Sequence, residues 1–362
     1  MSPWSDNGRP PAPIGAKGRS LADAHSPGGH DGAGRDAGDR GGDASSRLPH
    51  ALVACAVGGV IATSQMSLLA PVLVAYGLCL PADRDGRRAL ALGGAVALCV
   101  ALALSAGAGG ASMVSAAITT LTGLLVAVLA RTGRSTPGAA CLGVAAVAAL
   151  HAGSDAAFAA LSGTTLVDTM RGLIASYEQV LVETSAASAS QVHAAARMIG
   201  VFWPSAYVAV GFAEFACGRV GVRMAAMSVR GDAYPARLDA FDLPLWMVAT
   251  LVATAAALAA ALTVPAVPSW VLVAVANVAM ALRMAFAVQG LAVLVWVMRG
   301  KGLGSMAQVL LAALALYLEV QFVVLTVVGV VDVWANFRHL VRGEAPDGGD
   351  TEAQDNEPAQ AG

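Results

Sequence analysis

Charged side chains are scarce in this sequence of 362 residues, and they are scarcest in its middle. Only 13% of the residues are Asp, Glu, Lys or Arg, whereas soluble domains carry roughly 25%. Between the two ends of the chain, most charges lie in short clusters that separate apolar runs of about 20 residues, the length that a helix needs to span hydrocarbon. This deficit argues against a soluble domain and predicts an all-α, polytopic transmembrane helix bundle.

Sequence motifs of nucleotide hydrolysis, zinc proteases and serine hydrolases are also missing. The chain has no GxxxxGK[ST], no HExxH and no GxSxG, and its five cysteines form no CxxC pair. No acid, base and nucleophile stand at a usable spacing. We therefore expect no enzymatic activity, no metal site and no cofactor, and we interpret the cysteines as small apolar packing residues.

The two ends of the chain differ in composition from the middle. Residues 1–48 are rich in Gly, Pro, Ser, Asp and Arg and lack the apolar core of a signal peptide, so we expect a disordered tail. Acids balance its basic residues, which argues against binding of nucleic acid. Residues 343–362 carry six acids and no base and predict a second disordered tail. The transmembrane helical domain is therefore expected over 49–342, with the lipid bilayer as its partner.

Hydrophobic runs predict about eight spans in this domain. The first run is ambiguous, because Pro71 and the polar stretch 63–65 interrupt it. It forms either one kinked span or two half-spans, and the second alternative raises the count to nine. The expected spans are 51–80, 88–105, 112–130, 138–153, 199–217, 244–264, 269–298 and 305–331.

Basic residues in the short loops set the expected orientation of these spans. Alternate loops are rich in Arg and Lys, and these are 81–88, 131–137, 218–243 and 299–303. We expect these loops on the cytoplasmic side of the membrane. A single crossing after Lys301 then places Arg338 and Arg342 outside, against the same rule. Either 269–298 or 305–331 is not a simple crossing, or the C-terminal tail is external.

The interval 154–197 is too polar to span a membrane. Within it, apolar residues recur at steps of three and four, which predicts one face of an amphipathic helix on the outer side. This helix either rests on the membrane surface or caps the bundle. The stripe consists of Leu166, Met170, Leu173, Tyr177, Val180 and Thr184.

Ionisable residues within spans are costly and are candidates for function or for buried pairing. Glu214 shares a helix face with Tyr207, Gly211 and Gly218, and it either contacts a ligand or pairs with the nearby arginines, Arg219 or Arg223. His151 and Asp155 are four residues apart at the outer end of a span, where surface capping is the favoured role.

Arg283 lies near the middle of the run 269–298, with Asn277 and Gln289 six residues away on either side. It contacts a ligand, pairs with a buried acid such as Glu319 or Glu214, or lies at the membrane interface. Glu319 itself is expected on one helix face with Gln308, Thr326, Ala312 and Ala315, and this face either binds a ligand or forms interhelical hydrogen bonds.

Two further patterns concern contacts with partners or lipid. Ala54, Gly58 and Ala62 follow one another at four-residue steps, which allows close approach of another helix. At the end of the last span stand an acid, two aromatic residues and an arginine. Such a set is typical of an anchor in the membrane interface, with partner docking as the alternative. Its members are Asp332, Trp334, Phe337 and Arg338.

The C-terminal third also resembles a known family. Phe241-Asp-Leu-Pro244 is followed by Gln289-Gly-Leu-Ala292, by the basic turn Arg299-Gly-Lys-Gly-Leu303, and by the stretch from Gly329 to Arg338. This order resembles the YybS-like family of bacterial membrane proteins, although Ala335-Asn336 stand where that family often has an acid or a similar polar group.

The resemblance implies a fold similar to the S-components of energy-coupling-factor transporters. It then implies a small-molecule pocket toward the outer side, a T-component with ATPases as partners, and a docking role for Ala54, Gly58 and Ala62. The expected function is accordingly a binding or transport subunit. The alternative is a non-transporting scaffold or assembly protein of the cell envelope.

Overall fold

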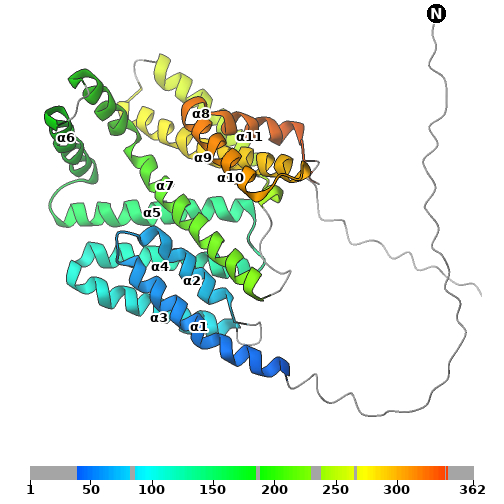
Figure 1. Ribbon diagram of the computed structural model, residues 1–362. Helices are drawn as coiled ribbons and strands as arrows, with labels where there is room; N and C mark the ends of the chain where they lie inside the picture. Colours follow the sequence, from blue (N-terminus) through cyan, green and yellow to red (C-terminus); the bar gives the residue numbers. More distant parts are fainter. Residues whose placement is uncertain are drawn as a thin grey trace, which may run out of the picture. The chain divides into compact units, whose positions relative to one another are not determined.

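The computed structural model describes residues 39–81, 86–184, 188–229, 238–264, 267–338 and 340, and all regular structure in these ranges is helical (Figure 1). The all-α prediction is confirmed. The helices are α1 Asp39–Ala62, α2 Ala70–Cys79, α3 Gly86–Ser105, α4 Gly110–Arg131, α5 Pro137–Leu161, α6 Leu166–Thr184, α7 Ala189–Val229, α8 Leu245–Thr263, α9 Ser269–Gly300, α10 Ser305–Phe322 and α11 Val324–Ala335.

Helix α1 begins at Asp39, so the last ten residues of the predicted disordered tail 1–48 are helical, and that boundary is wrong. The predicted disorder of 1–38 and of 343–362 lies outside the described residues. The chain divides into two compact units at Asp43, and the packing described below belongs to the unit that begins at Ala44.

Seven of the described helices are long and apolar enough to cross a membrane: α3, α4, α5, α7, α8, α9 and α10. The shorter apolar helices of the described residues lie at 47–62, 67–79 and 324–335. This set is compatible with an integral membrane protein.

The first apolar run forms two short helices, which decides between the two alternatives for 51–80. Thr63 and Ser64 turn their hydroxyls back to the carbonyls of Val60 and Ile61, and this local bonding ends α1. Pro71 lies in the first turn of α2, where its missing N–H costs nothing. The interruption therefore falls at the polar stretch rather than at the proline.

Helices α1 and α2 pack as an antiparallel hairpin. A Cβ on Gly58 would lie 2.7 Å from the Val74 side chain, and a Cβ on Gly77 would lie 2.7 Å from the carbonyl oxygen of Ala51. Ala62 is buried beside α2, α3 and α4. The small-residue stripe of Ala54, Gly58 and Ala62 closes this hairpin, so its prediction as a docking face for a partner helix is wrong.

The last predicted span, 305–331, is broken as well. Val323 has a φ of +59°, a conformation that is rare for a β-branched residue, and it separates α10 from α11. The expected single face of Gln308, Glu319 and Thr326 is therefore wrong, because the break removes the helical register between the last two.

Contacts with α9 give the direction of these two helices. Gln308, early in α10, bonds to Leu303 just after α9, and Glu319 bonds to Arg283 much nearer the middle of α9. Helix α10 thus runs back along α9. Helix α11 then returns beside α9, because Thr326 contacts Arg283 whereas Asp332 contacts Gln289. Together α10 and α11 form a second hairpin, whose two ends lie toward the same end of α9.

Besides the small cluster around Ala62, two larger apolar cores hold the described helices together. The first includes Val74, Leu78, Val126, Phe215 and Val222 and joins α2, α4 and α7. The second joins α8, α9 and α11 and includes Leu243, Met247, Leu282, Phe286 and Val333.

The polar interval 154–197 forms the end of α5, the whole of α6 and the start of α7 (Figure 1). None of the residues in α6 is buried, and Leu173, Tyr177 and Val180 of its apolar stripe are all exposed. The stripe therefore packs on no core, which argues against the cap and leaves the surface helix as the prediction.

Candidate functional site

The tip of the α10–α11 hairpin is built around an ion pair. Arg283 Nε donates to Glu319 Oε1 at 3.0 Å, and its Nη2 donates to the Glu319 carbonyl at 2.6 Å. The other carboxylate oxygen accepts the backbone N–H of Thr326 at 2.9 Å. The base thus lies at the C-terminal end of α10 and the acid at the N-terminal end of α11, where each complements the helix dipole. Arg283 pairs with an acid of the chain.

An apolar cleft of about 350 Å³ lies beside this pair, between α7, α8 and α9. Val201 and Phe202 of α7, Leu258 of α8 and Ala279 of α9 are among its walls, and Arg283 is its one charged lining residue. The third guanidinium nitrogen, Nη1, makes no hydrogen bond to any part of the chain that the structure describes.

Asn277 bridges two backbone groups of α7 next to the cleft, close to Pro204. Pro204 interrupts α7, and one residue later the backbone N–H of Ser205 donates to Asn277 Oδ1 at 2.8 Å. Asn277 Nδ2 in turn donates to the carbonyl of Val201 at 2.8 Å. The N–H and the carbonyl are four residues apart, so the amide bridges one rung of the helical ladder. Asn277 is a structural link between α7 and α9.

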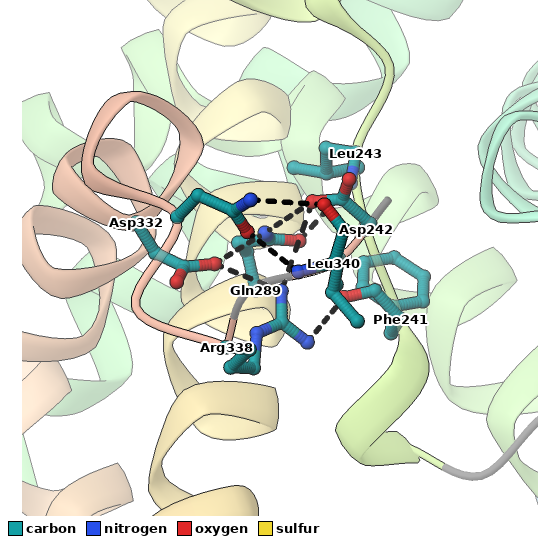
Figure 2. A network of polar contacts seen from close by, with 8 residues as sticks. Phe241, Asp242, Leu243, Gln289, Asp332, Arg338 and Leu340 are labelled. Carbon is teal, nitrogen blue, oxygen red and sulfur yellow. Dashed lines mark hydrogen bonds and ion pairs between the residues drawn. The ribbon is translucent and has the colours of Figure 1, made fainter. Parts of the chain in front are cut away.

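Gln289 lies in a buried polar network that joins α9, α11 and the segment before α8 (Figure 2). Its Nε2 donates to Asp332 Oδ2 at 2.8 Å and to Asp242 Oδ1 at 3.0 Å, and its Oε1 accepts the N–H of Leu243 at 3.1 Å. Arg338 Nη2 donates to Asp332 Oδ2 at 2.8 Å. The network fastens the returning end of α11 to the start of α8.

This geometry corrects the interface anchor for two of its four residues. The side chains of Asp332 and Arg338 are both fully buried, so neither reaches lipid headgroups. Arg338 Nη1 instead donates to the carbonyl of Phe241 at 2.8 Å. Trp334 and Phe337 are exposed, and for these two the anchor stays a prediction.

Glu214 lies in a second polar cluster, in the other half of the molecule. Its side chain is 2% exposed and accepts hydrogen bonds from Thr119 at 2.7 Å and from Thr122 at 3.1 Å, both on α4. His151 Nε2 of α5 lies 3.3 Å from the same carboxylate. Pairing of Glu214 with Arg219 or Arg223 is wrong, because Arg219 donates to Ser135 and Arg223 is exposed.

His151 and Asp155 have separate partners. The histidine side chain is only 12% exposed and faces Glu214, so surface capping is wrong for it. Asp155 is exposed and accepts a hydrogen bond from the Tyr207 hydroxyl at 2.7 Å.

Three residues of these clusters were missed as site candidates: Thr119, Thr122 and Asp242. The run Thr-Thr-Leu-Thr at 119–122 is the one available signal for the threonines, since it places hydroxyls on an otherwise apolar helix. Asp242 precedes an apolar helix, where an acid is common and does not by itself indicate a buried contact.

Comparison with protein-family models, curated proteins and solved structures finds no match for this chain.

Proposed function

We propose that this protein is a multi-pass membrane protein with six full crossings and two hairpins that enter and leave on the same side. Six helices cross: the seven candidates without α10, which is one arm of the second hairpin. With this topology all four basic loops and Arg338 lie on one side, as the distribution of positive charge requires. The conflict over the side of the membrane that carries the C-terminal tail disappears. The basic loops face the cytoplasm, and the membrane is a bacterial inner membrane.

We further propose that the protein is a small-molecule binding or transport subunit. The observation that supports this is the break at Val323 with its ion pair beside an apolar cleft. Irregular backbone at membrane depth is tolerated where it is buried in protein or lines a cavity, and broken helices form the binding sites of many transporters. A cleft of about 350 Å³ is within the range of ligand pockets.

The cleft favours one class of ligand. Its walls are apolar, and Arg283 Nη1 offers one hydrogen-bond donor. Glu319 already balances the guanidinium charge, so a second anion would bring an uncompensated charge into the membrane. The ligand is therefore a largely apolar, uncharged molecule with a hydrogen-bond acceptor at one end.

Energy for transport comes from other proteins in this proposal. The sequence has no recognised nucleotide-binding motif, and the resemblance to the YybS-like family implies a T-component and ATPases. The stripe of Ala54, Gly58 and Ala62 is occupied within the chain, so such partners contact another surface.

Native mass spectrometry of the protein, purified gently from membranes of its host, tests the ligand and the partners together. Ala279→Trp fills the cleft, and Ala274→Trp places the same side chain on an exposed position of the same helix. We expect a bound mass in the parent and in Ala274→Trp and its loss in Ala279→Trp. A parent without any small bound mass contradicts the proposal.

A second candidate function is a non-transporting scaffold of the cell envelope. The observation in its favour is that Glu319, Asp332, Arg283 and Arg338 satisfy one another inside the chain. Co-purification of envelope proteins, without ligand and without ATPases, is the outcome that favours it.

A further inference from the structure

The negative charge of an ionised Glu214 is not balanced by a permanently charged base among its hydrogen-bond partners in the described residues. Among the described residues, the hydrogen-bond partners of Glu214 are His151, which can carry a positive charge, and two threonine hydroxyls. An ionised carboxylate beside a neutral imidazole leaves one uncompensated negative charge in the bundle, which is costly to bury. One proton removes that charge, on the imidazole as an ion pair or on the carboxyl as a neutral pair.

We propose that Glu214 and His151 form a proton-binding site inside the membrane domain. The site takes up one proton and exchanges it with the side of the membrane that carries α6. This inference does not depend on the small-molecule cleft, which lies beside α8 and α9 and shares none of these residues.

The neighbouring groups favour access from the α6 end. Along α5, Asp155 is one turn nearer to α6 than His151. It accepts a hydrogen bond from the hydroxyl of Tyr207 on α7. Asp155 is exposed, so polar groups lead from the surroundings toward the buried carboxylate. In the other direction along α7, Phe215, Val222 and Ala225 belong to the first apolar core. That core separates the site from the basic loops.

Two arginines on the helices around Glu214 have other partners, and a third, Arg223 of α7, is exposed. On α4, Arg131 donates to the carbonyl of Leu78. On α7, Arg219 donates to Ser135, and Cys217 stands three residues beyond Glu214. The short helix Ser67–Leu69, which packs on α4 and α7, carries no titratable side chain. The proton therefore resides on Glu214 or His151.

Infrared difference spectroscopy of the reconstituted full chain, titrated between about pH 4 and 9, tests the site directly. We expect acidification to raise either the C=O band of a protonated Glu214, which vanishes in Glu214→Gln, or the ring bands of a protonated His151, which vanish in His151→Gln. Should Glu214→Gln fail to fold, Thr122→Val serves in its place, because loss of one hydrogen bond shifts the frequency of the C=O band. Absence of both the protonated carboxyl and the protonated imidazole in the parent, or unchanged bands in these variants, overturns the proposal.

The direction of access has its own test, in a variant without the native cysteines. Ser154→Cys lies on α5 near Asp155, and Val222→Cys lies in the core on the opposite side of Glu214. With a membrane-impermeant cationic thiol reagent, we expect Ser154→Cys to react from the α6 side and Val222→Cys to react from neither side. Faster reaction of Val222→Cys from the basic side contradicts the stated access.

Discussion

Gly290→Ala is a sharp test of the way α11 is held against α9. A Cβ at this position would lie 2.0 Å from the carbonyl oxygen of Leu325, whereas ordinary contact begins at 3.4 Å. The obstacle is backbone rather than a flexible side chain, so the two helices have to separate by about 1.4 Å, the difference between these distances. Gly329→Ala meets the carbonyl oxygen of Phe286 at the same distance of 2.0 Å.

The expected cost follows from two opposing effects. Overpacking of a core costs about 1–3 kcal/mol and sometimes more, and the rigid backbone obstacle places Gly290→Ala at or above the upper end. Alanine regains about 1 kcal/mol of helix propensity. We therefore expect a net loss of about 2 kcal/mol or more. The double variant with Gly329→Ala should cost less than the sum, because the first substitution already separates the helices.

Unfolding by sodium dodecyl sulfate in mixed micelles, followed by circular dichroism, measures this loss. Gly94→Ala, inside α3, is the matched control. A Cβ at this position would lie 3.4 Å from the Leu124 side chain, which is an ordinary contact. We expect this control to be neutral or slightly stabilised. If Gly290→Ala unfolds at the same detergent fraction as the parent and the control, α11 does not pack on α9 as described.

Two more substitutions test polar contacts by the same assay. Asn277→Leu removes the amide bridge in α7 and should cost about 2 kcal/mol, because the Ser205 N–H loses its partner. Adding Pro204→Ala should recover part of this loss, because it restores direct backbone hydrogen bonding in α7. Arg283→Leu should cost about 2 kcal/mol, less than a fully buried pair because the side chain is 30% exposed; combining it with Glu319→Leu should recover stability, and a variant as stable as the parent would retire the pair.

The helical class and most positions of the apolar helices could be predicted from the sequence, because hydropathy acts locally and most of these helices are single apolar runs. The two hairpins are harder to predict from the sequence. At 51–80 the polar stretch 63–65 signals a break, and hydroxyls bonded to the preceding turn produce it. At Val323 no residue signals one, because valine is a poor choice for positive φ. Contacts made by Glu319 and Arg283, distant in sequence, fix that break.

The polar residues show the same limit. Cost of burial correctly directs attention to Glu214, Arg283 and Glu319, but sequence alone does not name their partners. Arg338 illustrates this, since an arginine after a span is usually interfacial and here it is buried by Asp332 and Phe241. That outcome depends on α11 returning beside α9, which depends in turn on the break.

The side on which the chain emerges after α11 tests the central claim most directly. Lys301→Cys, Leu340→Cys and Val267→Cys, each in a variant without the five native cysteines, are labelled with an impermeant maleimide in right-side-out and inside-out vesicles. Val267, in the loop between α8 and α9, marks the opposite side. The hairpin predicts that positions 301 and 340 are labelled from the same side and position 267 from the other. Labelling of position 340 together with position 267 would show that α10 and α11 together cross the membrane once, and would contradict the hairpin.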